Sequence, residues 1–93
     1  MPELLSEEDV SAQLSKCPEW ERAGAVIGRE LDFASFLDGI DFVQEVAELA
    51  EEANHHPDID IRWRKVKLVL STHSKGGLTE LDFALAQKID ALL

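Results

Sequence analysis

The sequence predicts an α+β fold of two layers, with helices packed on one face of a four-stranded antiparallel sheet. Apolar and polar residues alternate in the segments 20–33 and 59–70, as expected for strands that cover a core on one side. In 35–54 and 79–92, apolar residues recur instead every three or four positions, as expected for helices. The short connections within 20–33 and within 59–70 favour two antiparallel hairpins. With a further short helix before the first hairpin, the predicted order is α-β-β-α-β-β-α.

The length of 93 residues predicts one domain, which covers 1–93. Its 9 basic and 19 acidic residues give a formal net charge of −10, which disfavours direct binding to nucleic acids or to an anionic membrane surface. No apolar run approaches the roughly 20 residues that span a bilayer. The first residues lack the basic and apolar regions of a secretory signal, so a cytoplasmic location is expected.

The first helix is predicted to begin after Ser6, whose hydroxyl is a good N-cap, and to be ended by Pro18. The turn of the first hairpin is predicted at Ala23 and Gly24. Arg29 interrupts the apolar face of this hairpin and does not fit a simple half-buried strand.

The longest predicted helix covers residues 35–54 and carries apolar residues on two faces. One stripe is enough to pack a helix on a sheet. The second stripe predicts a further contact, with another element or another subunit, and we expect a homodimer or homotetramer through helix 35–54 and the sheet edges. The first stripe comprises Phe36, Ile40, Val43, Ala47 and Ala50, and the second comprises Phe42, Val46, Leu49 and Ala53.

Two strands and a final helix are predicted after this long helix. Trp63 alternates with Ile59 and Ile61 in the first of the two strands, which favours a place in the core. In the second strand, apolar residues alternate with lysines. Thr79 is a good N-cap for the last helix. The apolar face of that helix comprises Leu81, Leu85, Ile89 and Leu92.

Three histidines are the main candidates for chemistry: His55 and His56 follow the long helix, and His73 ends the fourth predicted strand. Imidazole titrates near pH 6.5, so these side chains can give or accept a proton at neutral pH. The structural alternative is that histidine only caps the helix end. Zinc binding is less favoured, because the adjacent His55 and His56 would need an irregular backbone to converge on one ion. Cys17 is the only cysteine, which excludes an internal disulfide or a cysteine-rich metal site.

The segment 51–57, which reads Glu-Glu-Ala-Asn-His-His-Pro, resembles the defining motif of the pterin-4a-carbinolamine dehydratases. In that family an acidic residue precedes His-His-Pro, and an aromatic residue, a further histidine and an aspartate follow. Trp63, His73 and Asp82 stand at these three positions here. Stretches on both sides of the motif are also similar to family sequence, so the resemblance covers nearly the whole chain.

The resemblance implies the dehydration of a 4a-hydroxytetrahydropterin to the quinonoid dihydropterin, which recycles the pterin after aromatic amino-acid hydroxylation. It implies that His55 and His73 are the acid–base pair beside the 4a-carbon. His56 is then the third catalytic histidine, which also holds and orients the pterin. Neither a metal nor a cofactor is implied, because proton transfer suits this reaction.

Three further residues are candidates for binding the pterin or for orienting a histidine. Glu51 lies one helical turn before His55, whose imidazole it could orient, although a solvated helix end would also explain it. Asp82 lies three residues after Thr79, which fits a capping box, with an orienting role as the alternative. Trp63 either walls the pterin or fills the core, and its alternation favours the core.

Two other functions remain open from the sequence. Some members of this family act as dimerisation cofactors of a transcription regulator, so the chain could be an oligomerising binding module that uses helix 35–54. It could also act on another pterin, such as one in molybdenum-cofactor metabolism. The expected protein partners are therefore an aromatic amino-acid hydroxylase or a transcription regulator, and the intact His55, His56 and His73 favour the enzyme.

Overall fold

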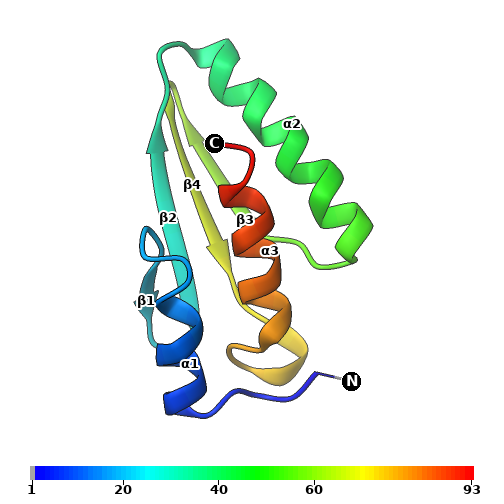
Figure 1. The fold of residues 1–93 in the computed structure, drawn as a ribbon. Coiled ribbons are helices and arrows are strands. Elements are labelled where there is room, and N and C mark those ends of the chain that lie inside the picture. The colour runs from blue at the N-terminus through cyan, green and yellow to red at the C-terminus, as the bar shows by residue number, and fades with distance from the viewer. Residues whose placement is uncertain (1) are drawn as a thin grey trace.

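The computed structural model describes residues 2–93 and confirms the predicted α+β fold and its element order (Figure 1). The four strands form one antiparallel sheet in the order β1-β2-β4-β3, and the helices lie on one side of it. None of these helices within residues 2–93 is long and apolar enough to cross a membrane. The elements are α1 (Glu7–Leu14), β1 (Glu21–Ala23), β2 (Val26–Asp32), α2 (Phe36–Ala53), β3 (Asp58–Arg62), β4 (Lys65–Leu70), the 3-10 turn η1 (His73–Lys75) and α3 (Glu80–Asp90).

The core lies between the sheet and the helices, and the inner strand β4 contributes three of its buried residues. Val66, Leu68 and Leu70 have no exposed surface, whereas the alternating Lys65 and Lys67 point to the open face of the sheet. The period of two seen in the sequence therefore separates a buried face from a solvated one. From α3, the core receives Phe83, Leu85, Ala86 and Ile89.

Arg29 fits into the inner face of β2 because it meets a carboxylate there. Its guanidinium donates to Asp90 Oδ1 at 2.7 Å, and Trp20 Nε1 donates to the same oxygen at 2.8 Å. This contact joins the first hairpin to the end of α3. The hairpin turn itself is Gly24–Ala25, one residue later than predicted, and Gly24 has a left-handed φ of 60°.

The buried stripe of α2 differs from both predicted stripes, because it takes Phe42 and Val46 from the second and Ala50 from the first. Phe42, Val46 and Ala50 are buried against the core, where Phe33 and Phe42 pack with ring centroids 5.1 Å apart. Phe36 and Leu37, at the start of the helix, remain exposed. The buried stripe holds α2 across the sheet and so fixes where its carboxyl-terminal end lies.

The prediction that Trp63 lies in the core is wrong. Trp63 sits in the turn between β3 and β4 with a left-handed φ of 54°, and 71% of its surface is exposed. Every residue of β3 is exposed as well, including Ile59 and Ile61. The reason is topological: β3 is an edge strand, so alternation in its sequence does not mean that the helices cover its apolar face.

Candidate active site

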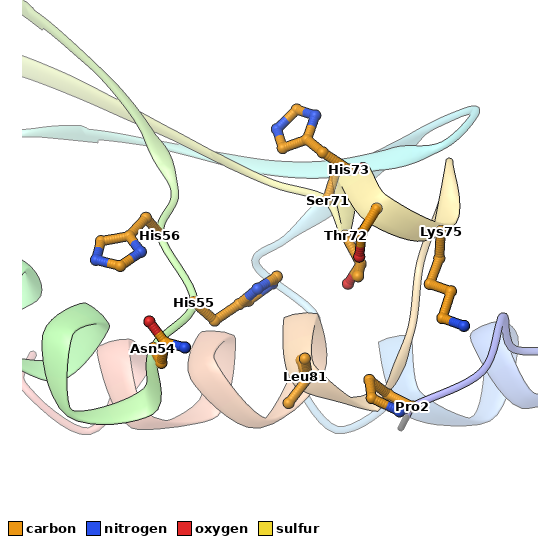
Figure 2. A pocket seen from close by; sticks show the side chains of 10 residues that line it. Pro2, Asn54, His55, His56, Ser71, Thr72, His73, Lys75 and Leu81 are labelled. Carbon is orange, nitrogen blue, oxygen red and sulfur yellow. The ribbon is translucent and has the colours of Figure 1, made fainter.

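A pocket of about 410 Å³ opens where the end of α2 meets the connection between β4 and α3 (Figure 2). All three histidines line it, although they come from segments far apart in the sequence. The lining residues are Pro2, Asn54, His55, His56, Ser71, Thr72, His73, Ser74, Lys75 and Leu81.

The end of α2 directs His55 into this pocket by a left-handed turn. Asn54 has φ 50° and ψ 42°, a conformation that asparagine tolerates better than most residues. The Asn54 N–H donates to the Glu51 carbonyl, and the His55 N–H donates to the Ala50 carbonyl at 3.1 Å. These two bonds make a Schellman motif, which ends the helix and fixes the direction of the next residues.

His55 is bonded to a buried carboxylate from α3. Its Nε2 lies 2.6 Å from Asp82 Oδ1, and Asp82 has no exposed surface. The carboxylate accepts the Nε2 proton, so the neutral imidazole carries its lone pair on Nδ1. Asp82 therefore fixes both the orientation and the tautomer of His55.

The other oxygen of Asp82 is held by two further donors. Asp82 Oδ2 accepts from the Thr79 N–H at 2.9 Å, which completes the capping box, and from the Thr72 hydroxyl at 2.9 Å. Because the Thr72 hydroxyl donates its one proton to Asp82, it accepts the hydroxyl proton of Thr79, 2.7 Å away. Asp82 thus makes both of the contacts considered from the sequence, the helix cap and the bond to a histidine.

Glu51 pairs with His56, and not with His55 as its spacing suggested. His56 Nε2 lies 2.5 Å from Glu51 Oε2, and both side chains are largely exposed. The left-handed turn at Asn54 explains the difference, because His55 no longer continues the helix one turn after Glu51. Glu51 is also outside the set of residues that line the pocket.

His73 reaches the pocket from η1, just beyond the end of β4. It is exposed, and its ring has no hydrogen bond within residues 2–93, in contrast to the rings of His55 and His56. In Figure 2 its ring points away from His55. Both ring nitrogens are therefore available to a bound molecule or to water.

Trp63 is not brought to this pocket. It precedes β4, whereas the pocket lies beyond the other end of that strand. The structure adds lining residues that the sequence analysis did not select, and Thr72 and Lys75 are the most informative of them. Both lie within two residues of His73, which is the signal that could have found them.

No group of three or more histidine, cysteine, aspartate or glutamate side chains within residues 2–93 is arranged to hold a metal ion. The carboxylates next to the pocket are instead engaged by imidazole nitrogens. The arrangement is suited to proton transfer. His55 is oriented by a buried carboxylate, His56 is paired with a carboxylate at the surface, and the ring of His73 has no partner within residues 2–93.

Comparisons with known proteins show the family of this chain. The sequence profile of the family described as pterin 4 alpha carbinolamine dehydratase matches residues 3–92. A protein of Mycobacteroides abscessus is 54% identical over 87 residues, which are 94% of this chain and 93% of that protein. One from Mycobacterium tuberculosis H37Rv is 54% identical over 89 residues, 96% of this chain and 95% of that protein. Both carry the provisional name of a pterin-4-alpha-carbinolamine dehydratase.

Two solved structures share the fold. A transcriptional coactivator/pterin dehydratase from Brucella melitensis superposes with a TM-score of 0.90 and 31% identity, covering 95% of this chain and 96% of that one. A pterin dehydratase-like protein described as a RuBisCO assembly factor in the alpha-carboxysome gives a TM-score of 0.65 and 26% identity, over 78% and 84% of the two chains. With a family profile that matches nearly every residue and relatives more than half identical over at least 93% of their length, this chain belongs to the pterin-4a-carbinolamine dehydratase family.

Proposed function

We propose that this protein is a 4a-hydroxytetrahydropterin dehydratase that works by histidine acid–base catalysis without a metal ion. The observation that carries the proposal is the buried Asp82–His55 pair, which leaves His55 Nδ1 as a lone pair in a pocket shared with His56 and His73. A base held in one tautomer beside two further imidazoles is suited to moving two protons in one reaction.

In the proposed reaction the C4a–O bond breaks and the hydroxyl leaves as water. His73, the exposed histidine, gives a proton to the leaving oxygen, while the N5 lone pair forms the new C4a=N5 double bond. His55 then accepts the N5 proton, and Asp82 stabilises the imidazolium that results. His73 regains a proton from solvent, and the His55 imidazolium releases its proton to solvent, which restores both side chains. His56, held by Glu51, contacts the bound pterin and helps to orient it.

The test is the dehydration of a 4a-hydroxytetrahydropterin, followed in the presence of a metal chelator. We expect the wild-type protein to accelerate it and the His55→Ala/His73→Ala double variant to lose about 10²-fold or more. Gln87→Ala, on the exposed side of α3, is the matched control. Wild-type rates equal to those of the double variant would remove the catalytic proposal, and a loss of activity with chelator would restore the metal alternative.

We further propose that a second copy of the chain covers the exposed apolar residues of β3 and α2. Ile59 and Ile61 lie on an edge strand, and Leu37 of α2 is 69% exposed. An antiparallel pairing of two β3 strands centred on Ile61 sets Asp60 opposite Arg62 of the second copy, which pairs unlike charges. The edge strand therefore suits a homodimer, and the outer face of α2 suits its association into a homotetramer.

The oligomer is tested by light scattering at micromolar concentration. We expect Ile61→Lys to reduce the oligomer toward the monomer and Leu37→Lys to stop association at the dimer, whereas Gln87→Lys leaves the mass unchanged. A monomeric wild-type protein would contradict the proposal. The names of the two solved relatives, a coactivator and an assembly factor, favour protein binding as a second role of this chain.

A further inference from the structure

The pocket carries no acidic side chain at its surface, although the chain as a whole is strongly acidic. Asp and Glu make up 19 of the 93 residues, yet none lies among the described residues that line the pocket. Lys75 lines it together with the three histidines. Two carboxylates lie next to the pocket, and both are bonded to histidines: Asp82 to Nε2 of His55 and Glu51 to Nε2 of His56. Among the described residues that line the pocket, Lys75 is therefore the one that carries a full charge at neutral pH, and this charge is opposite in sign to that of the chain as a whole.

Lys75 is held at a defined place on the rim. Its N–H donates to the Thr72 carbonyl at 2.9 Å, and the left-handed Gly76 that follows donates to the His73 carbonyl at 3.1 Å. A bridge between Thr72 and Gly77 closes the loop at its base. The position of Lys75 is therefore fixed by backbone bonds and does not depend on its side chain.

The side chain of Lys75 is half-buried and takes part in none of the ion pairs found in residues 2–93. In Figure 2 it lies on the opposite side of the pocket from His56, with its ammonium directed toward Pro2. To meet this ammonium, a substituent of a molecule whose reacting carbon lies beside His55 has to extend across the pocket, away from His56.

We propose that Lys75 is a specificity-determining residue that binds an anionic oxygen on the side chain of the pterin substrate, a phosphate or a carboxylate. A full charge at the rim matches a full charge on the ligand, and such charge-assisted hydrogen bonds are about twice as strong as neutral ones. The proposal rests on the proposed dehydratase function for the identity of the ring, and it deepens that function by naming the substrate class.

The test compares three 4a-hydroxytetrahydropterins whose C6 substituents are methyl, a chain ending in carboxylate and a chain ending in phosphate. In Lys75→Met, we expect KM for an anionic substrate to rise about tenfold more than KM for the methyl compound, as expected for the loss of one charge-assisted bond. Lys75→Arg should restore most of the preference, and Lys88→Met, at the far end of α3, should leave it as in wild type. The substrate with the larger ratio identifies phosphate or carboxylate.

Binding of the corresponding 7,8-dihydropterins, which lack the 4a-hydroxyl, separates this inference from the catalytic one. We expect tighter binding of the anionic compounds, a preference that weakens with salt and that Lys75→Met removes. Equal losses for methyl and anionic compounds would mean that Lys75 contacts the ring, and no loss at all would mean that it is only a solvated loop residue; either result overturns the inference. If the anionic compounds bind but no substrate is dehydrated, the proposed function fails and the inference about Lys75 stands.

Discussion

The imidazole of His55 and the carboxylate of Asp82 are joined across 2.6 Å, in a place where the carboxylate has no contact with solvent. Asp82 belongs to the capping box of α3, and His55 follows the end of α2, so one carboxylate connects the two helix ends that form the pocket. The bonds of Asp82 to Thr72 and to the Thr79 N–H satisfy its second oxygen. A carboxylate whose two oxygens are both hydrogen-bonded is a rigid partner for an imidazole.

We predict that Asp82→Asn lowers kcat about 10²-fold, because an amide cannot accept from His55 on one side and from Thr72 and Thr79 on the other. If the amide nitrogen faces His55, the imidazole must take the opposite tautomer and its Nδ1 lone pair is lost. If the amide nitrogen faces the threonines, buried donors lose an acceptor at a cost of about 1–3 kcal/mol. The measurements are kcat, its pH profile and the free energy of unfolding.

Thr79→Val is the matched control for this prediction, because it removes the hydroxyl cap of α3 and leaves the bond between His55 and Asp82 in place. We expect it to cost about 1 kcal/mol of stability and to change kcat little. An Asp82→Asn protein with a normal kcat and a lowered stability would show that Asp82 is only a helix cap.

Glu51→Gln should have a much smaller effect than Asp82→Asn, although both change a carboxylate bonded to a histidine. The side chains of His56 and Glu51 are 53% and 78% exposed, and exposed ion pairs contribute about 0–1 kcal/mol. We expect less than a fivefold change in kcat, since 1 kcal/mol corresponds to about that factor. Parallel assays of the two variants check this, and equal losses would mean that His56 needs its carboxylate as much as His55 does.

The sequence selected residues that the structure brings together, but it assigned one pair of side chains incorrectly. Resemblance selected His55, His56, His73, Glu51, Asp82 and Trp63, and the structure brings all of them except Trp63 into or beside one pocket. Helical spacing paired Glu51 with His55, and that inference fails because the chain leaves the helix at Asn54. Such a pairing depends on a single left-handed residue, which a periodic pattern does not reveal.

The fold was predictable because its periodicities are long and regular, and its errors lie where the sheet ends. Both hairpins, the long helix and the final helix are confirmed. Trp63 was placed in the core because it continues the alternation of Ile59 and Ile61. Alternation shows which residues share a face of a strand, but strand order decides whether the fold covers that face. The order β1-β2-β4-β3 puts β3 at an edge, and this order depends on pairing across the whole chain.

Stability should fall at alkaline pH in a manner that depends on Cys17. Burial raises the pKa of the Cys17 thiol, and the nearby Asp90 carboxylate raises that pKa further. The unfolded chain therefore loses this proton at a lower pH than the folded protein. The stabilisation that comes from the raised pKa of the thiol is therefore fully present below the ordinary thiol pKa of about 8.5. The free energy of unfolding falls as pH rises above that value.

Urea unfolding of the wild type and of Cys17→Ala from pH 7 to pH 10 tests the effect of the thiol. The substitution costs some packing energy at every pH, so the informative quantity is the difference between the two proteins. We expect that difference to shrink as pH rises, because only the wild type carries the thiol. A difference independent of pH would contradict the shift.

The left-handed turn at Asn54 should be the most sensitive backbone position of the site. Asn54→Gly removes a side chain from a residue with φ 50°, a conformation that glycine adopts freely, so we expect a change in stability below about 0.5 kcal/mol and little loss of kcat. Asn54→Val places a β-branched residue in that conformation, at a cost of about 1–2 kcal/mol, and displaces His55 from Asp82. Denaturant unfolding and kcat are measured for both variants. A valine variant as stable and as active as the glycine variant would show that the Schellman turn does not position His55.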